Sequence, residues 1–390
     1  MNAPDPTTLR QVGIAALQAG DAASARRCFE QIAGSGQADA AVLIGQAMAC
    51  ERLGDSGAAC AAVDRALELD PSNLHGLIMK GDQLARAGNS RAAVSYYGAA
   101  TALSKQMPNL PPGLADSIRR AEEAHSGISK QIEKHLRRRL TIAGYDEERS
   151  SARFTRSMEL LTGKRRLFLQ QPRAFLFAEL PHREFYPRED FPWLDAVEAA
   201  THDICAELTD VLQADDAFVP YIQRPVTGPV RPHKLLDNPA WSASFLWKDG
   251  ALTPGAAQCP KTLAALAAVP LDRIRNRAPS VLFSLLKPGA HIPPHHGFLN
   301  SRLICHLPLI ASPGCFLRVG NEVRQWEKGK AWVFDDTIEH EAWNSSDETR
   351  VILIFDVWRP ELTEEERGLV AALWEAVDTF DTVPAERWSD

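Results

Sequence analysis

Nineteen residues, Pro288 to His306 (PGAHIPPHHGFLNSRLICH), contain four of the eleven histidines of the chain, and His340 follows in the segment FDDTIEHEAW. Neutral imidazole is a good ligand for divalent iron, and iron used in oxygen chemistry needs two or three protein ligands with other positions left open. We place His295 on the loop between two strands and His340 where the sheet turns back. Either histidine alone is more often structural, but together they predict an iron site.

Strand alternation places further polar groups around the same position. In Ser301 to Ile310, Arg302 and His306 fall on one face of the expected strand. Burying both is costly unless that face lines a polar pocket. Ser284 lies between apolar neighbours, and Arg350 begins a run, RVILIFDVW, that is apolar on both faces. We therefore expect these polar side chains to converge on one cavity.

The C-terminal half has the pattern of a small antiparallel domain. The dipeptide Gly320-Asn321 between CFLRV and EVRQW is a two-residue hairpin turn. Many short strands with tight turns indicate a jelly roll or a cupin-type barrel. Helices are expected at 193–212 and from about Thr363. Period-two segments predict strands at 241–247, 280–287, 301–310, 315–319, 322–326, 330–335 and 350–358.

The first hundred residues contain an internal repeat. Gly20-Asp21, Gly54-Asp55 and Gly88-Asn89 recur at a spacing of 34, which is the tetratricopeptide period. Small residues that let paired helices approach, and bulkier residues that fill the groove between them, follow at constant offsets: Ala25, Ala59 and Ala93, then Phe29, Val63 and Tyr97. The segment resembles tetratricopeptide repeats, which usually bind proteins or peptides on a concave face. Alternatively, the helices brace the next domain, and both roles are compatible.

Composition bounds the protein class. The chain has 390 residues, 45% hydrophobic and 24% charged, with a net charge of −7. These values fit a soluble multidomain protein and argue against a general nucleic-acid binder. The basic run 130–139 is interpreted as the solvated face of a linker helix. No secretory signal, apolar span or paired-cysteine spacing is visible, so we expect seven reduced cysteines, a cytoplasmic location and no stable membrane anchor.

The expected fold class is multidomain α + β. Helical repeats come first, and a double-stranded beta-helix (jelly-roll or cupin-like) barrel with flanking helices follows. The expected parts are a tetratricopeptide-repeat domain (1–107), a helical linker (108–163), the barrel (164–362), and a C-terminal helix and tail (363–390).

Several motifs in one order carry a family resemblance. They are GxHxxPHxG, NxRLxxHL, GC, VFDDxxxHExW and DVWxPELT, spread between about Arg166 and Leu362. Together they resemble the aspartyl/asparaginyl beta-hydroxylase family of iron(II)- and 2-oxoglutarate-dependent dioxygenases, whose fold is a double-stranded beta-helix. The family's best-known member also has tetratricopeptide repeats before its catalytic domain.

The resemblance assigns roles residue by residue. It implies that His295 and His340 are the iron ligands and that Arg350 holds the distal carboxylate of the co-substrate 2-oxoglutarate. Most related dioxygenases carry an aspartate at the position of Gly297. The family that this chain resembles has glycine there, as this chain does, so a water completes the iron site in this interpretation. Where the best-known member has a second co-substrate arginine, this chain has Ile304. The remaining roles are co-substrate contacts for Ser284 and His306 and substrate-carboxylate binding for Arg302.

The expected function is hydroxylation of an aspartyl or asparaginyl substrate, peptidyl or free, that the repeats recruit as a protein or peptide. Two alternatives remain open, one within the same enzyme class and one from another class. One is a lipid acyl-chain hydroxylase of the same family, and the other is an inert barrel attached to a tetratricopeptide binding protein. A cupin enzyme that uses no 2-oxoglutarate would leave Arg350 without a special duty.

Overall fold

The computed structural model describes residues 5–107, 109–110, 112–214, 216–224 and 233–380. The chain divides into two compact units, residues 1–165 and 166–390. Pro108 and Pro111 of the expected breaker, and the expected tail 381–390, lie outside the described residues.

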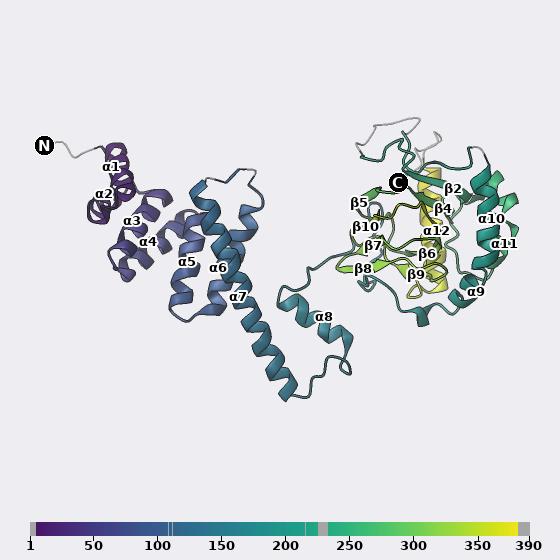
Figure 1. Cartoon of the computed structure of the whole chain (residues 1–390), viewed down its shortest axis with the longest axis horizontal. Coiled ribbons are helices and arrows are strands. Elements are labelled where there is room, and N and C mark those ends of the chain that lie inside the picture. Colours follow the sequence, from purple (N-terminus) through teal and green to yellow (C-terminus); the bar gives the residue numbers. More distant parts are fainter. Residues whose placement is uncertain (1–4, 108, 111, 215, 225–232, 381–390) are drawn as a thin grey trace. The chain divides into compact units, whose positions relative to one another are not determined.

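The first unit consists of helices (Figure 1). Six of them pack in sequence as antiparallel pairs, and two more complete the unit. Among the described residues these are α1 Pro6–Gln18, α2 Ala22–Gly34, α3 Ala40–Arg52, α4 Ser56–Leu69, α5 Leu74–Arg86, α6 Ser90–Ser104, α7 Pro112–Ile142 and α8 Ala152–Leu161.

The repeated Gly-Asp and Gly-Asn dipeptides are the turns within the helix pairs. Asp21 caps α2 by accepting a hydrogen bond from the Ser24 N–H at 3.0 Å, and Asp55 caps α4 in the same way through Ala58. The preceding glycines have a positive φ that other residues adopt at a cost. They are Gly20, Gly54 and Gly88, with φ of 83°, 77° and 77°.

The bulky residues of the repeat fill the space between neighbouring helices, as predicted. A Cβ on Gly45 would lie 2.6 Å from the Phe29 ring, and one on Gly81 would lie 2.6 Å from the Tyr97 ring. The two aromatic side chains are buried. Close packing of large rings on glycine therefore explains why the alternation of small and large residues follows the 34-residue period.

The second unit contains two antiparallel sheets. The larger has the order β1-β2-β4-β11-β6-β9 with β3 beside β2, and the smaller has the order β5-β10-β7-β8. The strands form two open sheets that face each other and, among the described residues, do not close into the expected barrel. The expected α + β class, with helical repeats followed by an antiparallel β domain, is confirmed. Their bounds are β1 Val219–Pro220, β2 Trp241–Lys248, β3 Ala251–Leu252, β4 Val281–Leu286, β5 His291–His295, β6 Arg302–Ile310, β7 Cys315–Val319, β8 Glu322–Gln325, β9 Trp332–Phe334, β10 His340–Asn344 and β11 Arg350–Trp358.

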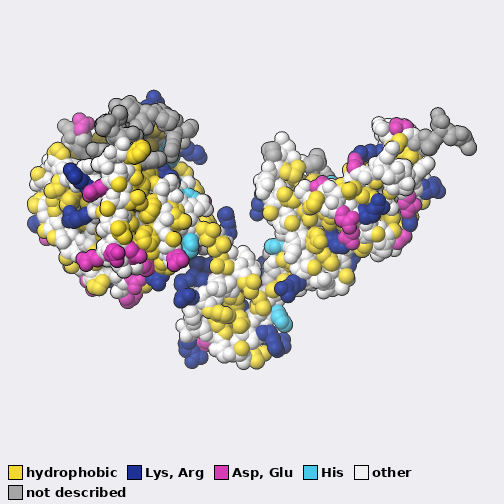
Figure 2. Space-filling view, turned by 180° about the vertical axis from the view of Figure 1, so that it is seen from behind, with side chains coloured by type: hydrophobic (Ala, Val, Ile, Leu, Met, Phe, Trp, Pro, Cys, Tyr) yellow, Lys and Arg dark blue, Asp and Glu magenta, His cyan; other side chains and the backbone are white. Residues whose placement is uncertain are grey.

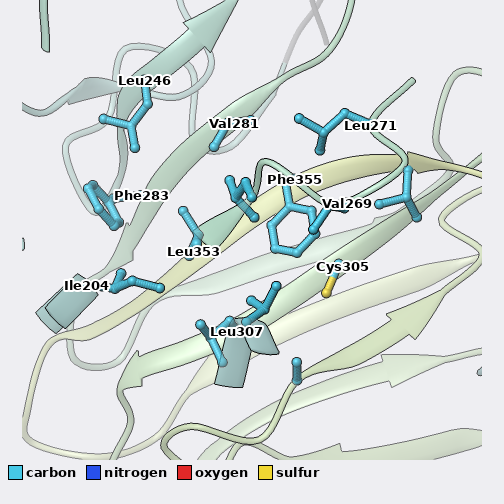
Figure 3. Close-up of a cluster of buried hydrophobic side chains, with 14 of the residues drawn as sticks. Ile204, Leu246, Val269, Leu271, Val281, Phe283, Cys305, Leu307, Leu353 and Phe355 are labelled. Atoms are coloured by element: carbon cyan, nitrogen blue, oxygen red, sulfur yellow. The ribbon is translucent and has the colours of Figure 1, made fainter. Parts of the chain in front are cut away.

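The larger sheet separates two hydrophobic clusters. On one face, Phe283, Leu307 and Phe355 pack with side chains from α9 Leu194–Ala199, α10 Thr201–Gln213 and the segment around α11 Pro260–Ala265 (Figure 3). On the other face, side chains such as Ile352 meet Leu317 of the smaller sheet. The single helix expected at 193–212 is two helices that adjoin at Ala200.

The last described helix is α12 Glu364–Thr379. Its N-cap is Thr363, which accepts a hydrogen bond from the Glu366 N–H while the Glu366 side chain binds the Thr363 N–H. The predicted start of this helix is therefore confirmed. Trp374 and Val370 pack it against Trp358 at the end of β11.

Candidate functional site

The two predicted iron ligands are direct neighbours in the smaller sheet. His340, the first residue of β10, pairs with His295, the last residue of β5, and their ring centroids are 4.0 Å apart. The expectation that His295 lies on a loop was wrong. The run HIPPH forms a strand because β10 pairs with it along its length, although two prolines remove backbone donors from it.

Backbone carbonyls orient both imidazoles. Nδ1 of His295 hydrogen-bonds to the Pro293 carbonyl at 2.8 Å, and Nδ1 of His340 hydrogen-bonds to the Ile338 carbonyl at 3.1 Å. A carbonyl accepts only, so each Nδ1 carries the proton and each Nε2 carries the lone pair that a metal requires. Burial and the neighbouring His295 hold the pKa of His340 well below its usual range, which also favours the neutral ligand form.

Arg350 is buried, and its guanidinium is unpaired among the described residues. Only 1% of its surface is exposed, and none of its three guanidinium nitrogens has a hydrogen-bond partner among the described residues. Its guanidinium carbon lies 4.7 Å from the centroid of the Trp326 ring, and burial lowers its pKa to about 9. A buried cation of this kind is costly, and a planar two-pronged anion such as a carboxylate would satisfy it.

The other predicted co-substrate residues lie on the same face of the larger sheet. Strand register places Ser284 of β4 opposite Ile352 and His306 of β6 opposite Ile354, and residues 350, 352 and 354 alternate onto one face of β11. Nδ1 of His306 has no hydrogen-bond partner among the described residues. Burial, and then the charge of Arg350, holds the pKa of His306 well below its usual range.

Aromatic contacts connect these groups to the histidine pair. The Phe334 ring lies 4.7 Å from the His306 ring and 5.8 Å from the His340 ring. Trp241 of β2 lies 6.4 Å from the His295 ring and donates a hydrogen bond from Nε1 to the Ser284 Oγ at 3.2 Å. Sequence reasoning gave Trp241 no role, because one tryptophan in an apolar strand carries no distinguishing pattern.

Asp336 occupies the space beside Gly297. A Cβ on Gly297 would lie 2.0 Å from Oδ2 of Asp336, and the Gly297 N–H donates to the Asp336 carbonyl at 2.7 Å. The Asp336 carboxylate therefore leaves no room for a side chain at position 297. The described residues contain no cluster of three or more His, Cys, Asp or Glu arranged to hold a metal.

Ile304 and Arg302 differ in their surroundings although they share a face of β6. Ile304 belongs to the apolar cluster between the sheets. Arg302 forms ion pairs with Asp356 at 2.5 Å and with Asp336 at 3.6 Å. A substrate carboxylate at Arg302 would therefore meet a guanidinium already flanked by two carboxylates.

Asp335 holds the turn that leads into His340. Its carboxylate accepts hydrogen bonds from the Thr337 N–H at 3.0 Å and from Gln170 Nε2 at 2.6 Å, and it forms a buried ion pair with Arg359. Its bonds to the turn and to Arg359 position the segment that precedes His340.

A fourth charged residue joins the Arg302 network from outside the motifs. Asp272 has no exposed surface, and neither of its carboxylate oxygens has a hydrogen-bond partner among the described residues. Burial, followed by the nearby charge of Asp356, raises the pKa of Asp272 well above its usual range, although Arg302 opposes this. An isolated aspartate in LDRIRN gives no sequence pattern from which this position could have been found.

Replacing Asp272 should change how stability depends on pH. The folded state keeps the Asp272 carboxyl protonated above the ordinary aspartate pKa of about 3.9, at which the unfolded chain loses the proton. The free energy of unfolding of the wild type should therefore fall as pH rises above about 4, by up to about 1.4 kcal/mol per pH unit. Asp272→Asn should remove this component. Urea denaturation at several pH values, followed by tryptophan fluorescence, measures it, because all nine tryptophans lie in residues 166–390.

The exposed Asp347 supplies the control for this experiment. Asp347→Asn should keep the pH dependence of the wild type. Parallel curves for the wild type and Asp272→Asn would show that the Asp272 carboxyl is ionised in the folded state.

The smaller sheet of the second unit carries the His295–His340 pair, and the larger sheet carries the buried Arg350. Residues 198–360 match the family model described as aspartyl/asparaginyl beta-hydroxylase, and residues 13–73 match that of the tetratricopeptide repeat. The chain thus contains one segment that matches the tetratricopeptide-repeat model and one that matches the aspartyl/asparaginyl beta-hydroxylase model.

Individual relatives cover only part of the chain. The aspartyl/asparaginyl beta-hydroxylase of Homo sapiens is 40% identical over 141 residues, which are 36% of this chain and 18% of the human protein. The ornithine lipid ester-linked acyl 2-hydroxylase of Rhizobium tropici is 33% identical over 188 residues, which are 47% of this chain and 63% of that protein. The chain spans less than two thirds of either relative.

Solved structures match the helical unit. One is the TPR2B domain of yeast Sti1 in a pHsp70 complex, with 19% identity over 32% of this chain and 97% of that chain. Its TM-score of 0.28 carries no functional conclusion.

Proposed function

We propose that the second unit is an iron(II)- and 2-oxoglutarate-dependent hydroxylase and that the repeats recruit a protein or peptide bearing an aspartyl or asparaginyl substrate residue. The observation that carries this proposal is Arg350, a fully buried arginine with no hydrogen-bonding partner among the described residues, on the face that also holds His306. Bound iron would supply dioxygen activation for hydroxylation of a C–H bond, coupled to oxidation of 2-oxoglutarate.

The chain's own residues have separate duties in this proposal. His295 and His340 would hold the metal through Nε2, since their Nδ1 atoms are engaged by carbonyls. Arg350 would bind the distal carboxylate, with Ser284 and His306 as further contacts. Phe334, Trp241 and Trp326 would exclude water from the pocket, which strengthens the electrostatic attraction between guanidinium and carboxylate.

Substitution of His340 tests the metal site. Anaerobic addition of iron(II) and 2-oxoglutarate to the wild type should produce a visible charge-transfer band. His340→Ala should lose the band and weaken iron(II) binding by more than about 100-fold, because removing a ligand costs more than removing a residue that only orients one.

His291, which lies on β5 with His295, gives a matched control. It is half exposed and hydrogen-bonds to Glu341 at 2.8 Å, away from the His295–His340 pair. His291→Ala should keep the band. Survival of the band in His340→Ala would contradict the assignment.

A lipid acyl chain is the second candidate substrate. The match to this chain covers a larger share of the ornithine lipid hydroxylase than of the human hydroxylase. The ion pairs that already occupy Arg302 also make a substrate carboxylate less necessary at that position. Succinate release measured with peptide, free amino acid and ornithine lipid in parallel separates the two candidates.

A further inference from the structure

The segment from Lys130 to Arg165 has a charge opposite to that of the rest of the protein. It carries ten Lys or Arg and five Asp or Glu side chains, a net charge of +5, in a chain whose net charge is −7, so the remainder carries −12. The segment includes the last three turns of α7 and all of α8. Such asymmetry marks a surface that attracts anionic partners.

The acidic side chains of this segment do not neutralise its exposed face. Glu133 pairs with Arg137 and Lys164, and Glu159 pairs with Arg165. Asp146 and Glu147 also form ion pairs with neighbouring arginines. Six exposed cations have no ion pair among the described residues: Lys130, Lys134, Arg138, Arg139, Arg153 and Arg156.

Exposed apolar side chains lie between these cations. On α7 the row Lys130, Lys134, Arg138 ends four residues later in Ile142, which is 70% exposed. On α8, Leu161 is 77% exposed, and Leu160 and Phe154 are also exposed. Figure 2 shows Lys and Arg side chains alternating with hydrophobic atoms on the lower central lobe, which contains this segment.

The two helices are tied together at this surface. Tyr145 follows α7, and its hydroxyl lies 2.8 Å from Thr155 Oγ1 of α8, while its ring contacts Phe154 with centroids 5.6 Å apart. Lys164 reaches Glu133 on α7 at 3.7 Å. The basic rows of α7 and α8 therefore belong to one packed structure and can act on one partner.

We propose that this surface, the α7–α8 basic surface, binds an anionic lipid bilayer at its headgroup layer. Clusters of four to eight Lys or Arg attract acidic headgroups, and aliphatic side chains between them gain free energy at the boundary with the acyl chains. A nucleic acid would favour aromatic rings for stacking on bases, and Phe154 is the one exposed aromatic residue among the apolar side chains named above. The proposal is independent of the chemistry of the second unit.

Vesicle co-sedimentation of the full chain tests the proposal. We expect binding to phosphatidylcholine vesicles that contain phosphatidylglycerol, no binding to phosphatidylcholine alone, and weaker binding as salt concentration rises. The triple substitution Lys134→Glu, Arg138→Glu, Arg156→Glu should reduce the association constant at least about tenfold. Ile142→Ser with Leu161→Ser should reduce it severalfold and leave its salt dependence unchanged.

A matched control reverses three exposed, unpaired cations elsewhere in the same unit: Arg65→Glu, Arg91→Glu and Lys105→Glu. It changes net charge equally and should retain binding, while helical circular dichroism confirms that each variant is folded. Three results would overturn the proposal: no binding to anionic vesicles, an equal loss in the control, or displacement from vesicles by heparin at concentrations that indicate tighter binding to a soluble polyanion.

Discussion

Arg350→Met should make the second unit more stable in the absence of ligands while abolishing its response to 2-oxoglutarate. The wild type buries a guanidinium that has no hydrogen-bond partner among the described residues, and methionine fills a similar volume without an ionic desolvation cost. We expect the free energy of unfolding to rise by roughly 1–3 kcal/mol. With iron(II) already present under anaerobic conditions, 2-oxoglutarate at about 100 times its Kd should add about 2.7 kcal/mol to the free energy of unfolding of the wild type, and the same concentration should add nothing further to that of the variant.

Arg359 provides the contrasting control. It is as buried as Arg350, but it forms an ion pair with Asp335, which has no exposed surface either. Arg359→Met would leave the Asp335 carboxylate without this partner and should cost about 3–5 kcal/mol. Urea denaturation followed by tryptophan fluorescence compares both variants. Destabilisation by Arg350→Met, or an unchanged response to 2-oxoglutarate, would show that Arg350 serves the fold rather than an anion.

Gly297→Ala should destabilise the second unit by at least about 3 kcal/mol, near the upper end for overpacking. The added Cβ would overlap the Asp336 carboxylate, whose rotation would disturb its ion pair with Arg302. Asp336→Ala removes the obstructing atoms. The double variant should therefore be more stable than the sum of the single effects predicts, and a double-mutant cycle measures this coupling.

Gly368 in α12 is the control for the glycine itself. A Cβ there would meet no atom within 4 Å, so Gly368→Ala should be neutral or slightly stabilising. If Gly297→Ala were equally harmless, or if Asp336→Ala gave no rescue, the two side chains would not compete for one space.

The repeats and the strands of the larger sheet could be predicted because each follows a local rule. In a dipeptide such as Gly20-Asp21, the glycine adopts the left-handed turn and the aspartate caps the next helix, so the sequence itself marks each turn of the 34-residue repeat. Successive side chains of β6 and β11 alternate between two environments, as predicted, because one face of each strand packs on helices and the other packs on the smaller sheet. The open form of the two sheets depends on strand pairing between distant segments, which local pattern does not contain.

The candidate site shows the same division. His295, His340 and Arg350 stand out because histidine and arginine are unusual between apolar neighbours. Pairing of β5 with β10 could not be predicted, since HIPPH has the prolines of a loop, and tertiary hydrogen bonds override that preference. Asp272 is the clearest omission, because its charge environment arises from Asp356 and Arg302 on strands remote in sequence.

The two sheets also hold different halves of the proposed chemistry. Both histidines lie on the smaller sheet, whereas Ser284, His306 and Arg350 lie on the larger one, and the contacts joining them run through the apolar cluster between the sheets. If the proposed function is correct, the spacing of that cluster would set how far a chelating diacid must reach. Side chains such as Ile352 and Leu317 act as a spacer, so their volumes would tune the length of dicarboxylate that the pocket accepts.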